Sequence, residues 1–399
     1  MPEKYDVIVV GTGPAGGAAA FVLGEAGKRV LVLEKESIPR YKTCGGGLSA
    51  GLLSQFPFSF EDVIETDVRQ IAYTLGKHTT TMPVPARSVF MVMRSNLDAL
   101  LLDHTRAEIR TNSSIYKVEE TPDYIAVKIR NGEVFKSDYL IAADGANSTA
   151  AHSLGLRRQR TLAAAIEAEV PVSPEMLQEY AHKAQFFFGE IHLGYLWIFP
   201  KAEHLSVGIG SLHPRPGELQ ATLKRVMGRQ GISLDGIPMH GHPLPIYTRH
   251  QPIATRRALL AGDAAGLVDP FSGEGIRYAV KSGRLAAEAI LSGNTQVYSD
   301  KIYREIGINH TLAYGLALLF YHLPWLCYPL GVRNPFATQA FIDLLSDQAG
   351  YLDVILRLFG TLPIYLITET AAGAANLLSG PEARQSIRSA VYPSPYDKI

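Results

Sequence analysis

One of the two cysteines stands beside three consecutive glycines, in the stretch RYKTCGGGLS at residues 40–49. A thiol can donate a proton, and glycines leave backbone groups uncovered so that a ring or a ligand can lie against them. A second stretch, GYLWIFPK at residues 194–201, places Tyr195, Trp197 and Phe199 on one face of a strand by alternation. The two stretches could form an apolar binding surface with a reactive thiol, or they could be ordinary core, where free cysteine is common.

The N-terminal segment has the pattern of a dinucleotide-binding unit. An apolar strand runs into Gly11, Gly13 and Gly16, which fit G-x-G-x-x-G at the start of an Ala-rich helix that also contains Ala15. The glycines allow a tight turn, close approach of a pyrophosphate and close packing of helix on strand. Glu34 ends the next strand, where its carboxylate can accept hydrogen bonds from ribose hydroxyls. These residues leave both NAD and FAD open.

Two later strands end in aspartate, at SDYLIAADGANS (137–148) and RRALLAGDAAGLVDPFSGEGIRYAV (256–280). They resemble the second and third flavin-binding segments of the para-hydroxybenzoate hydroxylase superfamily, and the resemblance implies FAD. In that superfamily the helix after the third segment points its N-terminus at the flavin ring. An arginine that usually follows the second segment is replaced here by Ala150 and Ala151. The cofactor-binding residues expected from the motif and the resemblance are Gly11, Gly13, Ala15, Gly16, Glu34, Cys44, Arg94, Asp144, Asp263, Gly275 and Ile276.

The stretches around the cysteine and the aromatic strand also resemble two motifs of the geranylgeranyl reductase family. Residues 39–46 match P-x-Y-x-x-C-G-G, and residues 195–201 match Y-x-W-x-F-P-K, followed by G-x-G at Gly208 and Gly210. The resemblance covers about the first 300 residues. Cys44 and Tyr195 are the catalytic candidates, and Tyr195, Cys44 or an ordered water could supply the proton that the reaction needs. The substrate-binding residues that the resemblance implies are Tyr41, Gly45, Gly46, Tyr195, Trp197 and Phe199.

The function implied is an FAD-dependent reductase that saturates carbon–carbon double bonds of a geranylgeranyl or related polyprenyl chain, by hydride transfer from reduced flavin N5 plus protonation. The chain would be carried by a lipid, a diphosphate, a chlorophyll precursor or a quinone. The reductant would be NADPH or reduced ferredoxin, the latter an electron-donor protein. A flavin monooxygenase or halogenase of the same superfamily is the alternative, and a non-catalytic flavoprotein is a third. Cys44 could also form a redox pair with Cys327.

The order of patterns predicts an α/β protein with a Rossmann-like FAD-binding domain, an inserted, mainly antiparallel sheet domain of α+β type, and a C-terminal helical region. We expect the FAD-binding domain at 1–75, 94–160 and 250–295. The sheet domain is expected at 76–93 and 161–249, and the helical region at 296–399. HGH at residues 240–242 is expected in a loop, with no metal site.

Lys and Arg balance Asp and Glu at 38 each, so nothing in the net charge favours nucleic acid. The two cysteines and an N-terminus without a signal-peptide pattern indicate a cytoplasmic chain. Apolar segments at 311–331 and 354–368 are interrupted by Pro324, Pro329 and Pro363. We expect helices there that line an apolar tunnel and dip into one leaflet at the inner face of a membrane, or that form a buried bundle.

Overall fold

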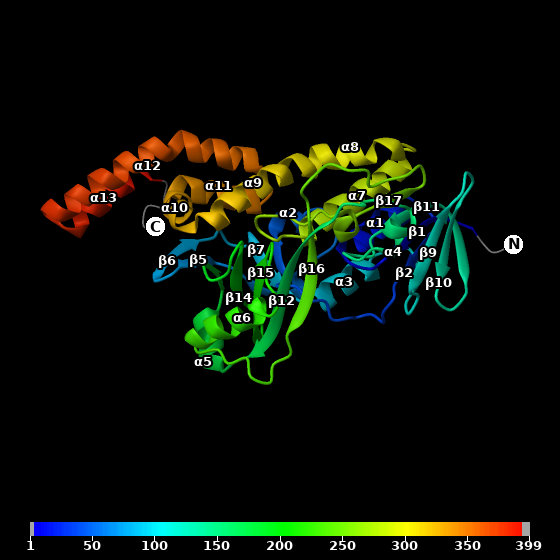
Figure 1. The fold of residues 1–399 in the computed structure, drawn as a ribbon, viewed down its shortest axis with the longest axis horizontal. Helices are drawn as coiled ribbons and strands as arrows, with labels where there is room; N and C mark the ends of the chain where they lie inside the picture. The colour runs from blue at the N-terminus through cyan, green and yellow to red at the C-terminus, as the bar shows by residue number, and fades with distance from the viewer. Residues whose placement is uncertain (1–3, 393–399) are drawn as a thin grey trace.

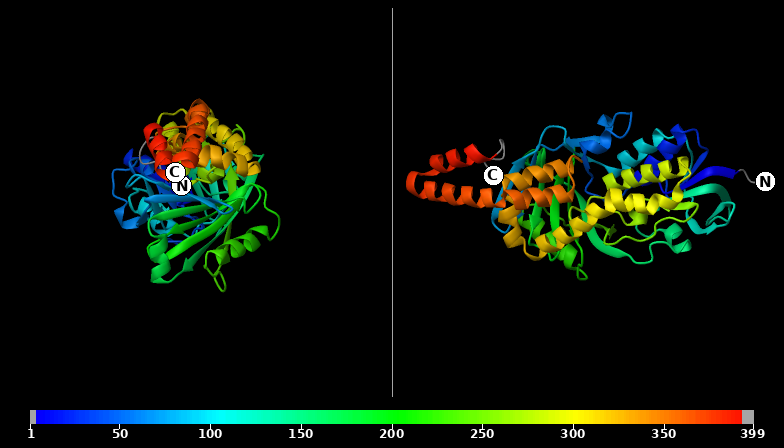
Figure 2. Two further views of the ribbon diagram at one scale, coloured as in Figure 1. Left: turned by 90° about the vertical axis from the view of Figure 1, so that its left-hand side faces the viewer. Right: turned by 90° about the horizontal axis from the view of Figure 1, so that it is seen from above.

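The computed structural model describes residues 4–392 as an elongated molecule of three parts (Figures 1 and 2). A first sheet with covering helices lies at the end that carries the N-terminus, and a second sheet lies beside it. A helical region extends from the second sheet to the opposite end, where the hairpin of its last two helices projects. This is the α/β architecture that the sequence predicted.

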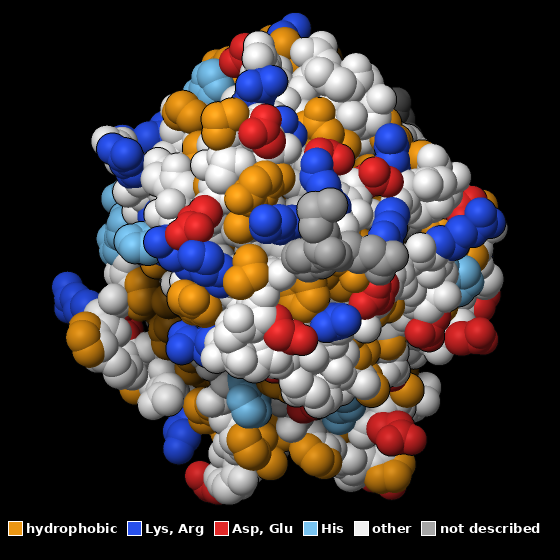
Figure 3. Space-filling view, turned by 90° about the vertical axis from the view of Figure 1, so that its right-hand side faces the viewer, with side chains coloured by type: hydrophobic (Ala, Val, Ile, Leu, Met, Phe, Trp, Pro, Cys, Tyr) orange, Lys and Arg blue, Asp and Glu red, His pale blue; other side chains and the backbone are white. Residues whose placement is uncertain are grey.

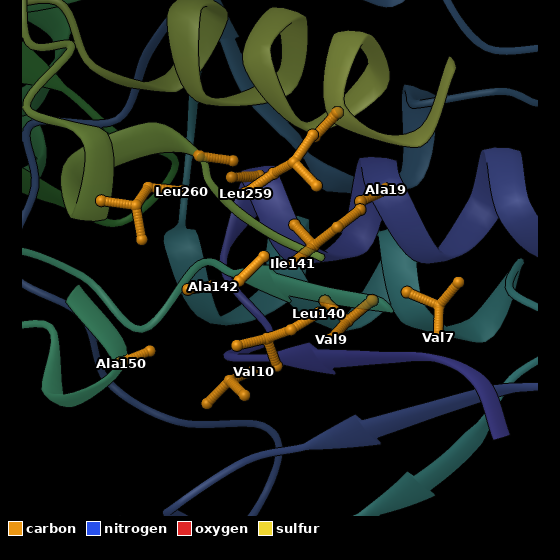
Figure 4. Packing of buried hydrophobic residues seen from close by; sticks show 14 of the residues in the cluster. Val7, Val9, Val10, Ala19, Leu140, Ile141, Ala142, Ala150, Leu259 and Leu260 are labelled. Atoms are coloured by element: carbon orange, nitrogen blue, oxygen red, sulfur yellow. The ribbon is translucent and has the colours of Figure 1, made fainter. Parts of the chain in front are cut away.

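The first sheet is parallel at its centre because its strands are buried on both faces. Its order is β8-β2-β1-β11, with β17 beside the carboxyl end of β11, and antiparallel β10 and β9 extend it from the other end of β11. Figure 4 shows apolar side chains of the central strands packed together, among them Val9, Ile141 and Leu259. The strands are β1 (Lys4–Val10), β2 (Val30–Leu33), β8 (Glu108–Arg110), β9 (Ile115–Glu120), β10 (Ile125–Ile129), β11 (Val134–Ala142) and β17 (Ala258–Leu260).

Helices α1 (Pro14–Glu25) and α7 (Ile276–Leu291) pack against each other beside this sheet. Their approach depends on a glycine, because a Cβ at Gly283 would lie 2.1 Å from the carbonyl oxygen of Ala15. The close packing keeps the N-termini of both helices near the ends of the parallel strands. Shorter elements of this part are α3 (Arg94–Asp103), α4 (Thr149–Ser153), η2 (Gly262–Ala265), η3 (Thr295–Val297), α8 (Tyr298–Ile302) and η4 (Tyr303–Gly307).

The second sheet has the order β16-β12-β15-β14-β13-β5-β6 and is antiparallel except between β13 and β5. A three-stranded antiparallel sheet, β3-β7-β4, accompanies it. The strands are β3 (Gly47–Ser49), β4 (Ile64–Asp67), β5 (Gln70–Leu75), β6 (His78–Pro83), β7 (Val89–Val92), β12 (Thr161–Pro171), β13 (Lys183–Phe188), β14 (Gly194–Pro200), β15 (His204–Ser211) and β16 (His240–Ile246). Helices of this part are α2 (Ala50–Leu53), η1 (Glu61–Val63), α5 (Pro174–Tyr180) and α6 (Glu218–Arg229).

Two expectations change here. Residues 70–75 form β5, which pairs with β13 and β6 of the second sheet, so we propose the expected domain division with these residues moved into the sheet domain. Local pattern could not show this, because the partner strand β13 lies far along the chain.

The HGH stretch does not lie in a loop: it begins strand β16, which pairs with β12.

The C-terminal region is helical, and its prolines act differently from one another. Helix α9 ends at His322 and α10 begins at Pro324, as a proline break predicts. Pro363, in contrast, lies inside α12, which continues through it. The helices are α9 (Ile308–His322), α10 (Pro324–Cys327), η5 (Tyr328–Val332), α11 (Pro335–Leu345), α12 (Tyr351–Ser379) and α13 (Pro381–Val391).

Among the described residues, α12 alone is long and apolar enough as a single helix to cross a membrane, by length and composition. Residues 295–332 meet the same test only as a pair of helical segments bent by 102°. Most of the apolar stretch of α12 lies on the surface, with Phe359 67% exposed and Ile367 70% exposed.

The contact of α7 with α1 generates the first prediction. Gly283→Ala should lower the free energy of unfolding by about 1–3 kcal/mol, because the added methyl group overlaps the α1 backbone. Urea denaturation of the FAD-loaded protein measures this. Gly228→Ala, on the exposed face of α6, is the control: its Cβ meets nothing within 4 Å, so stability should stay equal or rise. Equal effects of the two substitutions would contradict the role of the close contact.

Candidate active site

The glycine turn after β1 is shaped by backbone contacts that exclude any side chain. Gly11 has a φ of +95°, and a Cβ there would lie 2.3 Å from the carbonyl oxygen of Ala143. A Cβ at Gly16 would lie 1.9 Å from the carbonyl oxygen of Gly11. Ala15, buried in the first turn of α1, supplies the carbonyl on which Gly283 packs. The turn therefore presents bare backbone at the N-terminus of α1, as pyrophosphate binding requires.

Two guanidinium groups lie over this helix N-terminus. A Cβ at Gly13 would have Nη2 of Arg94 at 3.7 Å and Nη2 of Arg40 at 4.0 Å as its nearest neighbours. Asp98 holds Arg94 through two bonds of 2.9 Å, and Arg40 has a buried Nε without a hydrogen-bond partner. Such a donor set fits the pyrophosphate of a dinucleotide. Arg40 was missed in the sequence because it matches no motif position.

Glu34 is buried at the end of β2 and accepts a hydrogen bond of 3.0 Å from the backbone N–H of Thr12. Burial opposes its charge, but hydrogen bonding from Thr12 and the positive charge of Arg40 lower the pKa of Glu34 below its ordinary value. The carboxylate is therefore ionised at neutral pH, the state in which it could accept a ribose hydroxyl.

The two strand-end aspartates have different surroundings. Asp144 accepts from Ser148 and from the backbone N–H of Ala150, so both of its oxygens bind the first turn of α4. Asp263 lies near the start of α7, where its Oδ1 would be 3.8 Å from a Cβ at Gly275. Gly275 caps α7 without a side chain, and the first helical residue, Ile276, is buried. Asp263 and this helix N-terminus therefore lie together, whereas the carboxylate of Asp144 serves local structure.

Three polar residues outside the predicted set join the site. Lys42 Nζ lies 3.0 Å from Nε2 of His242, and that nitrogen lies 3.7 Å from Oδ2 of Asp263. Burial, and then the charge of Arg94, lower the pKa of Lys42 to about 8. The third is His240, whose ring packs on that of Tyr41 at 4.5 Å. The HGH stretch was the only sequence feature that pointed to these two histidines. They reach the cysteine loop because they lie on β16, the edge strand of the second sheet.

The cysteine loop is tied to the aromatic strand by a buried lysine. Nζ of Lys201 donates to the carbonyl oxygen of Gly45 at 2.8 Å and to that of Val92 at 2.7 Å. Gly46 has a φ of +71°, and a Cβ there would lie 2.0 Å from the same Val92 oxygen. Burial lowers the pKa of Lys201 to about 8. Lys201, the last residue of the Y-x-W-x-F-P-K motif, therefore holds the glycines of the P-x-Y-x-x-C-G-G motif. It was not among the predicted site residues.

The aromatic side chains of β14 lie directly against the glycines. A Cβ at Gly45 would be 2.9 Å from the Phe199 ring and 3.1 Å from Nε1 of Trp197, and that Nε1 is buried without a hydrogen-bond partner. The Trp197 ring covers Gly208, where a Cβ would lie 2.1 Å from Cζ2, so the G-x-G motif makes room for the indole. The predicted aromatic face is thus assembled on the cysteine loop. It continues through Tyr73, Phe186, Phe188, Phe271, Phe320 and Tyr321.

Tyr195 joins this wall to the loop before α7. Its hydroxyl donates to the carbonyl oxygen of Ser272, and burial raises its pKa well above the ordinary tyrosine value. Tyr41 lies farther out and donates to Glu167 at 2.7 Å. Tyr41 is therefore exposed at the rim of the site, whereas Tyr195 is inside it.

The thiol of Cys44 lies at the junction of the charged and aromatic parts. Its Sγ accepts from the backbone N–H of Gly46 at 3.4 Å and lies close enough to the guanidinium of Arg94 for the two groups to interact electrostatically. Burial opposes the charge of Arg94, but Asp98 and then Cys44 raise its pKa. Cys327 is free, as is Cys44, and the two pack against different apolar clusters.

A later arginine, Arg157, contacts the third flavin segment although the arginine position after the second segment is empty. That segment ends at Ser148, and the residues after it carry no arginine until Arg157. Arg157 is buried and donates through Nη1 to the carbonyl oxygens of Asp263 and Ala264. An arginine therefore holds the third segment from a later position in the chain, and no motif spacing indicated it.

A family model described as an FAD binding domain matches residues 4–292. The geranylgeranyl diphosphate reductase of Synechocystis sp. is 30% identical over 381 residues, covering 86% of this chain and 88% of that protein. The menaquinone reductase of Mycolicibacterium smegmatis is 29% identical over 331 residues, covering 75% and 79%. The crystal structure of a geranylgeranyl bacteriochlorophyll reductase-like protein from Thermoplasma acidophilum matches with a TM-score of 0.75 and 25% identity, covering 92% of this chain and 99% of that one.

The fold, the donor set at the N-terminus of α1 and these matches define an FAD-dependent oxidoreductase. FAD, rather than NAD, is thus the resident dinucleotide. Similarity over most of both chains, at 30% identity, narrows the class further. The chain belongs to the geranylgeranyl reductase family.

The buried lysine generates the second prediction. Lys201→Met leaves the carbonyls of Gly45 and Val92 without a donor and should lower the free energy of unfolding by about 1–3 kcal/mol at pH 7. The folded pKa of about 8 lies below the ordinary 10.5, so the unfolded chain binds more protons between these values. The free energy of unfolding of the wild type therefore increases with pH between these values. The difference in this free energy between wild type and Lys201→Met should increase with it.

Urea denaturation at pH 7 and pH 10 measures the difference in free energy of unfolding between wild type and Lys201→Met. Lys224→Met removes an exposed lysine of α6 and should change stability by no more than about 0.5 kcal/mol at either pH. If Lys201→Met does not change the free energy of unfolding at pH 7, the amine does not hold the loop. A difference that is the same at both pH values would contradict the lowered pKa of Lys201.

Proposed function

We propose that the protein saturates carbon–carbon double bonds of a geranylgeranyl or related polyprenyl chain. The observation that carries this is the assembly of the cysteine loop on the aromatic strand, held by Lys201 beside the FAD-binding segments. The surface is lined by rings and bare backbone, which suits an apolar chain without polar groups to bind. The names of the relatives in Synechocystis and Mycolicibacterium support the same substrate classes, a prenyl diphosphate and a quinone.

The glycine turn, Glu34, Arg40 and Arg94 would hold the nucleotide end of FAD, and Asp263 and the α7 N-terminus would hold its other end. When bound and reduced, FAD supplies a hydride from N5, with NADPH or reduced ferredoxin as the source of electrons. The partial positive charge of the α7 N-terminus favours the anionic reduced form.

The residues around the double bond have separate tasks. An isolated double bond has no carbonyl to accept charge, so addition of hydride is coupled to addition of a proton on the neighbouring carbon. Positive charge developing at the substituted carbon is stabilised by the faces of Trp197 and Phe199. These rings, with Tyr195, also exclude water from the reacting carbons.

Cys44 is favoured over Tyr195 as the proton donor. The Tyr195 hydroxyl is committed to the carbonyl of Ser272, and its raised pKa makes it a weaker acid. Cys44 lies between Arg94 and the aromatic wall. Its Sγ accepts from the backbone N–H of Gly46, and the positive charge of Arg94 nearby stabilises the sulfur after its proton has left.

We further propose that the α12–α13 hairpin attaches the enzyme to the surface of a membrane, where prenyl lipids reside. Apolar side chains of α12 are exposed, including Leu356, Phe359 and Ile367, and they recur at helical spacing. The opposite end of the molecule shows basic, acidic and apolar side chains intermixed (Figure 3). This difference between the two ends of the molecule favours attachment through the α12–α13 hairpin.

The third prediction tests reduction directly. The bound flavin is reduced anaerobically with dithionite, geranylgeranyl diphosphate or a geranylgeranyl lipid is added, and flavin reoxidation is followed beside the product mass. We expect reoxidation with a gain of two hydrogens per bond. Cys44→Ser should retain FAD and slow this step by about 10²–10⁴-fold, the usual contribution of a general acid, and Tyr195→Phe should slow it far less.

Cys327→Ala is the matched control and should keep the wild-type rate, which would also end the redox-pair hypothesis. Full activity in Cys44→Ser would leave the cysteine a structural residue. Reoxidation by oxygen alone, with an oxygenated product, would instead establish the monooxygenase function.

The fourth prediction concerns the membrane. The double variant Phe359→Ser/Ile367→Ser should float with anionic phospholipid vesicles at least about tenfold less than wild type, because two exposed apolar side chains are lost. Tyr116→Ser, an exposed aromatic residue on β9 at the other end, should float as wild type does. Equal flotation of all three proteins would contradict attachment through α12.

A further inference from the structure

A basic pocket lies apart from the predicted site residues. It is formed between the segment after α4, the segment after β16, the loop after β17, and α8 with η4. Its cavity volume is about 20 Å³, and it is open to solvent. The basic side chains that line it are Arg157, Arg160, Arg249 and His250, and no predicted cofactor or substrate residue is among its lining residues.

Two of the residues that line the pocket have a buried polar group without a partner. Arg157 is 5% exposed, and its Nη2 has no hydrogen-bond partner although Nη1 has two. Tyr247 is 7% exposed, and its hydroxyl likewise has no partner. A buried guanidinium cannot give up its proton, so an unpartnered N–H there is costly unless a ligand accepts from it.

The backbone around these groups leaves room for them. Gly266 has a φ of +72°, and a Cβ there would lie 3.2 Å from Nε of Arg157. A Cβ at Gly307 would lie 2.5 Å from the Tyr247 hydroxyl. The unpartnered arginine and tyrosine are thus accommodated by glycines on two different elements.

The charges facing the pocket are mostly of one sign. Burial, and then the charge of Arg160, lower the pKa of Arg157 to about 10, while Asp263 and Asp144 oppose this. Arg249 binds the side chain of Gln159, and His250 lies 3.6 Å from Asp300. An anion among the arginines would relieve their mutual repulsion.

We propose that this pocket binds a phosphate-bearing anion. Guanidinium groups match the geometry of phosphate oxygens, and the unpartnered Nη2 and hydroxyl supply two further donors from below. The exposed Arg160 and Arg249 close on the anion from the rim. The pocket shares no residue with the cysteine loop or the aromatic wall, but its Arg157 also donates to the carbonyl oxygens of Asp263 and Ala264 in the third flavin-binding segment.

Isothermal titration of the FAD-loaded protein with inorganic pyrophosphate tests the site. Wild type should bind, and Arg160→Ala/Arg249→Ala should raise the Kd by about tenfold or more through loss of two charged donors. Tyr247→Phe, which removes only the hydroxyl, should raise it by about fivefold. Arg106→Ala/Lys117→Ala removes two exposed charges elsewhere and should leave the Kd unchanged.

Absence of pyrophosphate binding to wild type, or equal Kd values in all variants, would overturn the proposal. Competition then identifies the source of the phosphate. Displacement of pyrophosphate by NADPH but not by NADH assigns it to the 2′-phosphate of a dinucleotide. Displacement by geranylgeranyl diphosphate but not by geranylgeraniol assigns it to a prenyl diphosphate, and displacement by neither leaves free phosphate as the occupant of the same site.

Discussion

The site depends on the hydrogen bonds that one buried amine donates to two backbone carbonyls. Lys201 ends the aromatic strand of the second sheet, and it reaches Gly45 in the cysteine loop and Val92 in the small third sheet. Burying an amine is costly unless its protons are bonded, so the arrangement tolerates little displacement. These hydrogen bonds fix the position of the cysteine loop against the aromatic strand, where the thiol, the bare glycines and the aromatic rings form one surface.

The segment from Asp263 to Gly275 connects the three parts of the molecule. From the second sheet, Tyr195 donates to the carbonyl of Ser272. From the helical region, the Tyr351 hydroxyl at the start of α12 donates to one carboxylate oxygen of Asp269. The other oxygen accepts from the backbone N–H groups of Phe271 and Ser272. The loop leads into α7, whose N-terminus belongs to the FAD site. The start of α12 and the loop before α7 are therefore linked through direct hydrogen bonds.

The polarity of the site changes along its length. Arg40 and Arg94 lie at the nucleotide end, where phosphates must be held, and Trp197 and Phe199 lie at the other, where an apolar chain is proposed to bind. Cys44 stands at the boundary, in contact with Arg94 and beside the glycines that touch the rings. A thiol is suited to this position because it packs as a hydrophobe and can still exchange a proton.

The sequence alone determined the features that depend on local pattern: the parallel sheet, the glycine turn, the acidic residue at the end of the second strand and the alternating aromatic face. Apolar runs, glycine spacing and alternation reflect short-range sterics and burial, so they can be read without a partner strand. Only the tertiary structure decided that β5 joins the second sheet, that α12 continues through Pro363, and that the histidines of β16 reach the cysteine loop. It also decided the roles of Lys201, Arg40 and Arg157, because each acts on atoms that are brought near by folding. Such contacts depend on how sheets and loops pack over long separations, and that is not encoded in the spacing of neighbouring residues.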